Sequence, residues 1–319
     1  MRYSTCYIEL TSKCNLQCKH CFYEKTLNDF IEVDYIYKCI DFFYNNKVRT
    51  FWLSGGEPLL YPYFNEVIQY ISSIPDLQWE LVTNGTLLNE KACKALIRSQ
   101  NLRCINISLD GADPEIHNYN RGEGAFDKTM EGVKRLISFG CNKIRLQMVV
   151  AKYNLTNIDR FITLAESLKV SYKILSLTDM GEAQKNALSI LPYDENEARR
   201  KAGVERKKIN YQCWLIKKNP IANIYIDFKG NVYLCRKFRE VGISVGNIYK
   251  EIISETCLSE LLEKIKLYSE DKKDCKGCSI THLCGKGCYA EAMLTQGKND
   301  GHCKERIFDF CRMLTRGDN

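Results

Sequence analysis

The chain has 319 residues, of which 45% are hydrophobic, and a formal net charge of +7. This length suffices for one large domain or two, and the apolar content excludes a disordered chain. The odd count of 17 cysteines argues against a secreted disulfide scaffold, and no apolar run is long enough to span a membrane.

From residue 3 to about 180, short apolar runs alternate with amphipathic stretches. The strand-like runs are Tyr3–Leu10, Thr50–Ser54, Trp79–Thr83, Cys104–Leu109, Ile144–Val150 and Ser171–Leu177. Helical periodicity occurs near 34–45, 63–73, 89–100, 126–139 and 156–169. Such alternation is typical of parallel strands joined by right-handed crossovers. The predicted fold class is α/β, a partial (β/α)6 barrel of the TIM type, with functional residues at the C-terminal ends of the strands.

Three cysteines follow the first strand-like run at a spacing of C-x3-C-x2-C: Cys14, Cys18 and Cys21. Three thiolates suit a [4Fe–4S] cluster that keeps one iron open to another ligand, because a closed cubane normally takes four. From the residues alone, a zinc site is the alternative, and His20 inside the motif would then serve as a further ligand.

Glycines or polar residues also follow the second, third and fourth strands, where side chains and backbone would meet a ligand at the barrel mouth. The residues concerned are Gly55, Gly56, Glu57, Asn84, Ser108 and Asp110. The two glycines would let a ligand approach the backbone closely. Gln147, within the fifth strand, either faces this ligand or makes a hydrogen bond in the barrel core. His117 is expected on the surface of a helix, with a substrate contact as the alternative.

The C-terminal third changes character after a bridging segment at 181–211. A hairpin is predicted from Ile221–Phe228 and Val232–Cys235, joined by a turn at Gly230. Beyond residue 270 the chain is dense in cysteine and glycine, so metal ligation is the natural source of its order. We therefore expect a core domain at 1–180 and a small cysteine-rich domain at 212–319.

The cysteine triad and the strand-end motifs resemble the radical S-adenosylmethionine (SAM) family. The resemblance implies that Cys14, Cys18 and Cys21 hold a cluster whose open iron chelates the amino and carboxylate groups of SAM. It also implies a set of SAM contacts: Gly55, Gly56, Glu57, Asn84, Ser108, Asp110 and Gln147. In that family, reduction of the cluster cleaves SAM to a 5′-deoxyadenosyl radical, which takes a hydrogen atom from the substrate.

The C-terminal cysteines, spaced C-x2-C-x5-C-x3-C and preceded by Gly230-x4-Cys235, resemble the SPASM extension, which carries two further [4Fe–4S] clusters. The resemblance assigns Cys213, Cys235 and Cys288 to an inner auxiliary cluster. It assigns Cys275, Cys278, Cys284 and Cys303 to an outer one, with Cys311 as an alternative last ligand. The inner cluster lacks a fourth cysteine, so an open iron, an oxygen ligand or a borrowed thiolate completes it. Two structural zinc sites are the alternative reading of the same residues.

The function implied by both resemblances is a maturase that cleaves SAM and forms a thioether or C–C crosslink in a ribosomally made peptide. The alternatives are a radical SAM dehydrogenase or epimerase of a sugar, other small molecule or peptide residue, and a zinc-binding adaptor that is no enzyme. Arg236 stands where sulfatase-maturating members carry an aspartate base, which argues against that activity. The sequence does not identify the general base or hydrogen donor.

The implied cofactors are SAM and three [4Fe–4S] clusters. The implied partners are a precursor peptide, an electron donor of the flavodoxin or ferredoxin type, and a separate leader-binding protein unless the barrel surface binds the leader. The sequence starts without the apolar segment of a signal peptide, so we expect a cytoplasmic protein without a membrane partner. Its basic runs, Arg199-Arg200-Lys201 and Arg206-Lys207-Lys208, lack interleaved aromatic residues, which argues against nucleic acid.

Overall fold

The computed structural model describes residues 2–22, 29–177, 181–186, 215, 221–270 and 289–294. These residues divide into two compact units. The first contains the described residues from Thr5 to Asn186 together with Ile226–Lys229, and the second contains the others. The predicted domain boundaries after residues 180 and 211 lie at or next to residues outside the described ranges, so they stay predictions.

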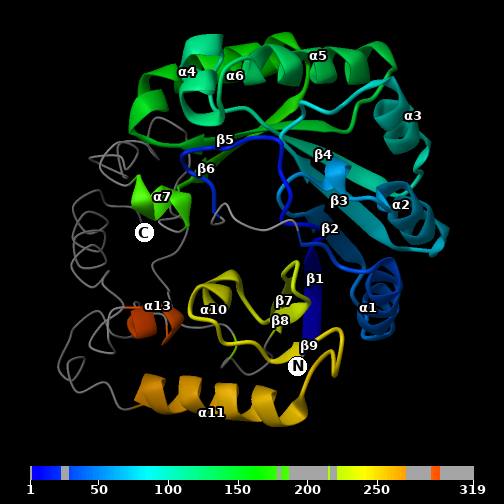
Figure 1. The fold of residues 1–319 in the computed structure, drawn as a ribbon, viewed down its shortest axis with the longest axis vertical. Coiled ribbons are helices and arrows are strands. Elements are labelled where there is room, and N and C mark those ends of the chain that lie inside the picture. Colours follow the sequence, from blue (N-terminus) through cyan, green and yellow to red (C-terminus); the bar gives the residue numbers. More distant parts are fainter. Residues whose placement is uncertain are drawn as a thin grey trace, which may run out of the picture. The chain divides into compact units, whose positions relative to one another are not determined.

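Six parallel strands form an open sheet that begins the fold (Figure 1). They are β1 (Arg2–Glu9), β2 (Thr50–Ser54), β3 (Gln78–Thr83), β4 (Leu102–Ser108), β5 (Ile144–Val150) and β6 (Ser171–Ser176). Their spatial order, β6-β5-β4-β3-β2-β1, follows the sequence, and each neighbouring pair is parallel. This arrangement confirms the predicted partial (β/α)6 barrel, and it brings the C-terminal ends of all six strands to one edge.

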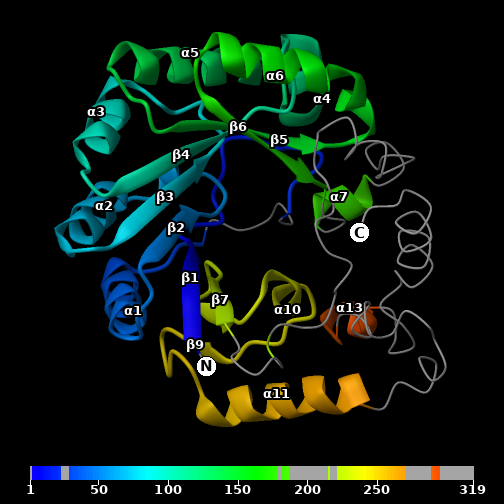
Figure 2. The ribbon, with the colours of Figure 1, turned by 180° about the vertical axis from the view of Figure 1, so that it is seen from behind.

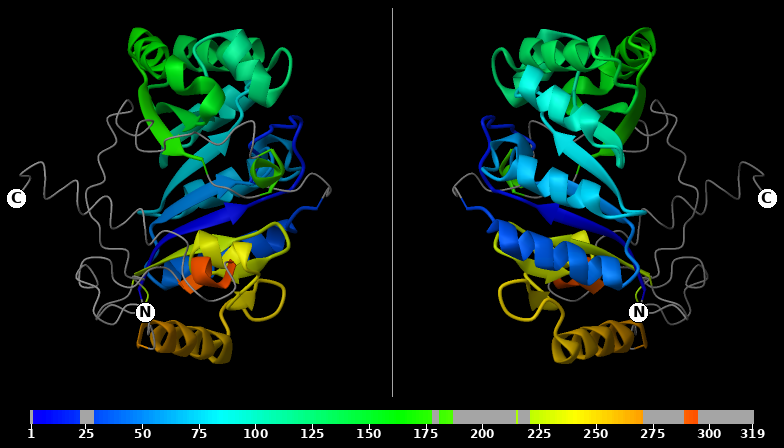
Figure 3. Two further views of the ribbon diagram at one scale, coloured as in Figure 1. Left: turned by 90° about the vertical axis from the view of Figure 1, so that its left-hand side faces the viewer. Right: turned by 90° about the vertical axis from the view of Figure 1, so that its right-hand side faces the viewer.

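Helices connect the strands and cover the outer, convex face of this sheet (Figures 1 and 2). They are α1 (Val33–Asn45), α2 (Phe64–Ser73), α3 (Glu90–Arg98), α4 (Pro114–Arg121), α5 (Ala125–Ser138) and α6 (Ile158–Ser167). The right-hand view of Figure 3 looks onto α1, α2 and α3 in front of the strands. In α1, Ile36, Cys39, Ile40 and Phe43 are buried at helical spacing, which makes one face apolar.

Helix α4 is an element that the periodicity of the sequence does not reveal. Asp113 caps its N-terminus by accepting a hydrogen bond from the Ile116 backbone N–H (3.1 Å), and Pro114 occupies the first turn. His117 lies on a helix as predicted, but not on its surface, because its side chain has no exposed area and its Nδ1 accepts from the Asp110 N–H (3.1 Å). With only eight residues, α4 offers too few turns for a hydrophobic pattern to stand out.

The burial of His117 predicts a pH-dependent stability. Desolvation, followed by the charge of Arg121, lowers the pKa of His117 to about 3. Because the unfolded imidazole titrates near pH 6.5, this stabilising contribution is complete above that pH and is lost as the pH falls toward 3. We expect urea unfolding to lose about 1.5 kcal/mol from this residue between pH 6.5 and pH 5. His117→Asn, which does not titrate, should flatten the profile by this amount, and parallel profiles would contradict the prediction.

The predicted hairpin is present, and its residues outside Ile226–Lys229 belong to the second unit. β7 (Ile221–Ile226) and β8 (Asn231–Tyr233) are hydrogen-bonded neighbours, and β9 (Gly246–Asn247) pairs with β8 in the antiparallel direction. Gly230 has a φ of +79°, and a Cβ there would lie 2.7 Å from the Tyr249 ring, so the end of the turn requires glycine.

Three helices complete the described part of this unit: α10 (Arg236–Glu240), α11 (Glu255–Glu270) and α13 (Tyr289–Leu294). Among the described residues of the chain, none of the helices is both long and apolar enough to cross a membrane.

Candidate functional site

The loop that carries Cys14, Cys18 and Cys21, called here the cysteine loop, begins where β1 ends, at the C-terminal edge of the sheet. Its backbone is fastened to the turn after β2. The Gly56 N–H donates to the Thr11 carbonyl (2.7 Å), and the Glu57 N–H donates to the Lys13 carbonyl (2.8 Å). The predicted edge position of the triad is thereby explained, since two strand ends meet in this contact.

Gly55 and Gly56 are required by this close approach of two backbones. A Cβ at Gly55 would lie 2.4 Å from the Thr11 carbonyl oxygen, and one at Gly56 would lie 2.3 Å from that of Lys13. We expected the glycines to open the backbone to a ligand, whereas the structure places the cysteine loop itself against them. Their contact with SAM stays a prediction.

The turn after β3 holds the same loop from another direction. Asn84 donates through Nδ2 to Asn15 Oδ1 (2.9 Å), and the same nitrogen lies 3.8 Å from Cys14 Sγ. Asn15 in turn donates to Thr86 Oγ1 (2.8 Å). Asn84 therefore stands beside the first cysteine, as a residue predicted to line the site would.

Glu57, which follows β2, is hydrogen-bonded to residues at the end of β3. Its carboxylate accepts from Thr83 Oγ1 (2.7 Å) and from the Asn84 N–H (2.8 Å), and its side chain is fully buried. Burial raises the pKa of Glu57, while these hydrogen bonds act in the opposite direction. The carboxylate thus joins the turns after β2 and β3, and its predicted contact with SAM stays a prediction.

Asp110, after β4, is the centre of a buried polar network. Its Oδ2 accepts from Arg121 Nε (2.6 Å) and Asn120 Nδ2 (2.7 Å) and lies 2.8 Å from His20 Nε2, while Oδ1 accepts from the Val149 N–H (3.1 Å). Although desolvation opposes it, the charge of Arg121 holds the pKa of Asp110 well below its usual range. Asp110 has no exposed surface and has protein partners on both oxygens, and its predicted contact with SAM stays a prediction.

The three cysteines differ in exposure but belong to one loop. Cys14 is exposed, Cys21 is half-buried and Cys18 is buried. The Leu16 N–H lies 3.4 Å from Cys14 Sγ, and electrostatic interactions join the Cys14 thiol to those of Cys18 and Cys21. Burial raises the pKa of both Cys14 and Cys18. Within the described ranges, no three His, Cys, Asp or Glu side chains already stand in the geometry of a metal site.

Two observations test whether a cluster and SAM fit here. The Tyr153 hydroxyl is buried and has no hydrogen-bond partner among the described residues, and its pKa is raised by burial and by the nearby charge of Asp110. A buried polar atom without a partner is typical of a place that a ligand or water completes. The donor set is also three thiols, whereas His20, the extra ligand of a zinc site, turns its Nε2 to Asp110. These residues fit an iron–sulfur cluster better than zinc.

A short helix that the sequence does not reveal, α7 (Glu182–Lys185), meets the far end of the loop. The Glu182 N–H donates to the Cys21 carbonyl (2.9 Å), and Asn186 Nδ2 donates to the Lys19 carbonyl (3.1 Å). This segment belongs to the stretch predicted as a bridge. Its side chains are mostly polar, so only the contact with the loop reveals its place.

Gln147 lies in the barrel interior, where its Nε2 donates to Asn106 Oδ1 (2.8 Å). Asn106 also donates to Glu80 Oε2 (3.0 Å), so these side chains form a polar layer between β3, β4 and β5. The core hydrogen bond was one of two expectations for Gln147, and the SAM contact stays a prediction. Ser108, half-buried at the end of β4, also keeps its prediction.

Among the predicted auxiliary ligands, the structure describes Cys235, a half-buried residue that precedes helix α10. The others lie outside the described residues: Cys213, Cys275, Cys278, Cys284, Cys288, Cys303 and the alternative Cys311. Their assignment to two clusters stays a prediction.

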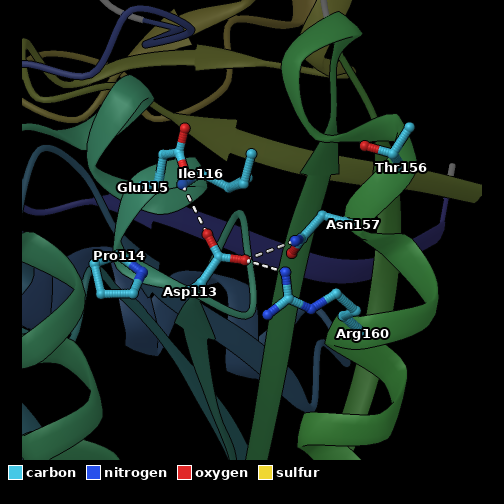
Figure 4. A pocket seen from close by; sticks show the side chains of 7 residues that line it. All are labelled: Asp113, Pro114, Glu115, Ile116, Thr156, Asn157 and Arg160. Atoms are coloured by element: carbon cyan, nitrogen blue, oxygen red, sulfur yellow. Dashed lines mark hydrogen bonds and ion pairs between the residues drawn. The ribbon is translucent and has the colours of Figure 1, made fainter.

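A pocket of about 580 Å³ lies between the starts of α4 and α6 (Figure 4). Asp113 Oδ2 accepts there from Asn157 Nδ2 (2.9 Å) and pairs with Arg160 Nη1 (3.0 Å). These polar groups satisfy one another, and none of the cysteines or predicted SAM contacts lines the pocket. It is therefore not the candidate site.

Comparison with known proteins identifies two domains in the chain. Residues 8–165 match the Radical SAM superfamily, and residues 213–279 match SPASM, an iron-sulfur cluster-binding domain. The chain is 26% identical over 306 residues to the antilisterial bacteriocin subtilosin biosynthesis protein AlbA of Bacillus subtilis, covering 89% of this chain and 67% of that protein. It is 29% identical over 182 residues to a GTP 3′,8-cyclase of Alkaliphilus metalliredigens, covering 55% and 57%.

A third relative is the mycofactocin maturase MftC of Mycobacterium tuberculosis, 28% identical over 176 residues, with coverage of 54% of this chain and 44% of that protein. The chain thus spans about half to two thirds of the length of these relatives. Two solved structures share the fold. SuiB of Streptococcus suis bound to S-adenosylmethionine has a TM-score of 0.77 at 16% identity, covering 94% of this chain and 75% of that one. Native anSMEcpe with bound AdoMet and a peptide has a TM-score of 0.65 at 20% identity, covering 99% of each.

These matches agree with the cysteine loop at the edge of an open parallel sheet. The chain therefore belongs to the radical SAM superfamily and carries a SPASM domain after its radical SAM domain.

Proposed function

We propose that this enzyme cleaves SAM reductively, abstracts a hydrogen atom from a ribosomally made peptide and forms a thioether or C–C crosslink. The observation that carries the proposal is the loop of Cys14, Cys18 and Cys21, held at the C-terminal edge of the sheet by the turns after β2 and β3. A peptide substrate is supported by the similarity to the subtilosin biosynthesis protein over 89% of the chain. SuiB, which shares the fold, has also been crystallised with its precursor peptide SuiA.

In this proposal the protein's residues bind and orient SAM and the peptide, and the cofactors supply the reactive chemistry. With a [4Fe–4S] cluster on the three cysteines, bound SAM would supply a 5′-deoxyadenosyl radical to take one hydrogen atom from the peptide. The auxiliary clusters would accept the second electron of the oxidation, and the second proton would be released to a base or to water. Gly55, Gly56 and Asn84 fix the cysteine loop and, with Ser108, form the proposed contact surface for SAM. Glu57, Asp110 and Gln147, which make the hydrogen bonds described above, complete the proposed set of SAM contacts.

The SPASM domain is proposed to hold two auxiliary [4Fe–4S] clusters on the cysteines assigned to them, for a total of three clusters. Iron and sulfide after anaerobic reconstitution are then expected at about twelve atoms each per chain. Cys235→Ala should lower iron by about four atoms, whereas Cys257→Ala, which changes an exposed cysteine of α11, should leave it unchanged. About eight irons in the unchanged protein would contradict one auxiliary site, and about four would contradict both.

Two further partners belong to the proposal. A flavodoxin- or ferredoxin-like protein would supply the electron for SAM cleavage. Leader recognition would come from a separate leader-binding protein or from the barrel's own surface.

The test is an anaerobic reaction with dithionite, SAM and short peptides encoded beside the gene. We expect 5′-deoxyadenosine together with a peptide that has lost the mass of about two hydrogens, as crosslinking by oxidation requires. Turnover of a sugar or another small molecule instead would favour the dehydrogenase or epimerase. A colourless, zinc-containing protein that ignores SAM would overturn the proposal in favour of an adaptor.

A further inference from the structure

A second feature of the site is the set of contacts between the last turn of α4 and the cysteine loop. The Lys19 N–H donates to the Asn120 carbonyl (2.9 Å), and the His20 N–H donates to Asn120 Oδ1 (3.2 Å). Next to these contacts, Arg121 Nη1 lies 3.9 Å from Cys18 Sγ. The sulfur of Cys18 therefore has a positive charge beside it.

The charged side chains of Arg121 and Asp110 are both buried in the protein interior. Arg121 is 6% exposed and Asp110 is 0% exposed, and Arg121 Nε lies 2.6 Å from Asp110 Oδ2. Buried charges are screened little by water or salt, so each acts on Cys18 with an effective dielectric constant far below that of water. Neither side chain is a ligand of the proposed cluster, which the three thiolates would hold.

We propose that the buried pair of Arg121 and Asp110 sets the reduction potential of the cluster held by Cys14, Cys18 and Cys21, with Arg121 raising it and Asp110 lowering it. The physical reason is that reduction adds one negative charge, which a nearby cation stabilises and a nearby anion opposes. Net charge and hydrogen bonds to the sulfurs are recognised determinants of such potentials. Arg121 and Asp110 are positioning residues in this role, and the inference rests on the proposed function because it requires the cluster.

The test is a redox titration of the reconstituted full-length protein. The extent of reduction is measured from the EPR signal that changes when SAM is added. That response distinguishes the SAM cluster from the auxiliary ones. In Arg121→Gln we expect the reduced-to-oxidised ratio at a fixed potential to fall about tenfold, which corresponds to a shift of about 59 mV to more negative values for a one-electron couple. In Asp110→Asn the ratio should rise. Opposite signs would not result from a general loosening of the loop.

Two variants serve as controls. Arg160→Gln removes the same charge from an arginine that also pairs with an aspartate, Asp113, but lies at the pocket between α4 and α6 (Figure 4), and it should leave the ratio unchanged. Arg121→Lys keeps the charge and should keep the ratio within about threefold of the unchanged protein, because the effect is electrostatic. If Arg121→Gln does not retain iron, Asp110→Asn and Arg121→Lys carry the same comparison.

Shifts of the same sign in Arg121→Gln and Asp110→Asn, or no shift in either, would overturn the inference. Equal shifts in Arg121→Lys and Arg121→Gln would also overturn it, since hydrogen-bond geometry rather than charge would then be responsible. An unchanged protein without any SAM-responsive signal would contradict the proposed function itself. The two failures are therefore distinguishable.

Discussion

Replacement of Cys14, Cys18 and Cys21 by alanine is expected to reduce the release of 5′-deoxyadenosine to background. The reason is that the three thiols are the only cysteines on the loop that the turns after β2 and β3 hold at the sheet edge. The variant should also lose about four of about twelve irons, because the auxiliary clusters use other cysteines. The measurement is chromatography of 5′-deoxyadenosine after reaction with SAM and dithionite, together with iron analysis of the same sample.

The matched control for this prediction is Cys257→Ala, which removes an exposed thiol from α11 in the second unit. It should retain both iron and 5′-deoxyadenosine release. Release that survives the triple replacement would refute the assignment of the SAM cluster, whatever the iron content.

Gly56→Ala should have nearly as large an effect although it removes no functional group. A new Cβ would lie 2.3 Å from the carbonyl oxygen of Lys13 and 2.5 Å from that of Ser12. Both are backbone atoms, so the loop between β1 and the first cysteine must move. We expect a loss of about 1–3 kcal/mol in the free energy of unfolding. We also expect loss of the iron bound to Cys14, Cys18 and Cys21, measured by urea unfolding and iron analysis.

Gly140→Ala separates this close approach from the general cost of replacing a glycine. Gly140 has a φ of +76°, and a Cβ there would meet nothing within 4 Å. It should therefore cost about 1 kcal/mol through backbone strain alone and leave iron unchanged. Full iron and normal SAM cleavage in Gly56→Ala would show that the loop tolerates displacement, against this prediction.

The sequence by itself determined the parts of this protein that depend on short stretches of chain. The predicted runs Thr50–Ser54 and Ile144–Val150 coincide with β2 and β5, because buried parallel strands are short and apolar between polar turns. The strand order follows from the crossover lengths, and the hairpin follows from the glycine turn at residue 230. The cysteine spacing is local too, so its family resemblance needed no fold.

The tertiary structure decided which protein groups the polar residues at the strand ends contact. Asp110 and Glu57 have the side chains that a SAM site requires, yet both are buried among protein donors. Gly55 and Gly56 have the backbone freedom that a ligand needs, yet the cysteine loop occupies the space beside them. A carboxylate accepts the same hydrogen bonds from a ligand as from an arginine, so residue type alone does not separate these roles.

The contact between Arg121 and Cys18 illustrates the physical reason. The two residues are 103 positions apart, and only the packing of the end of α4 against the cysteine loop brings them within 3.9 Å. The same packing buries His117 and turns His20 toward Asp110 rather than outward. Local sequence patterns determine which strands and helices form, whereas the burial and pairing of charges depend on contacts between segments that are distant in the chain.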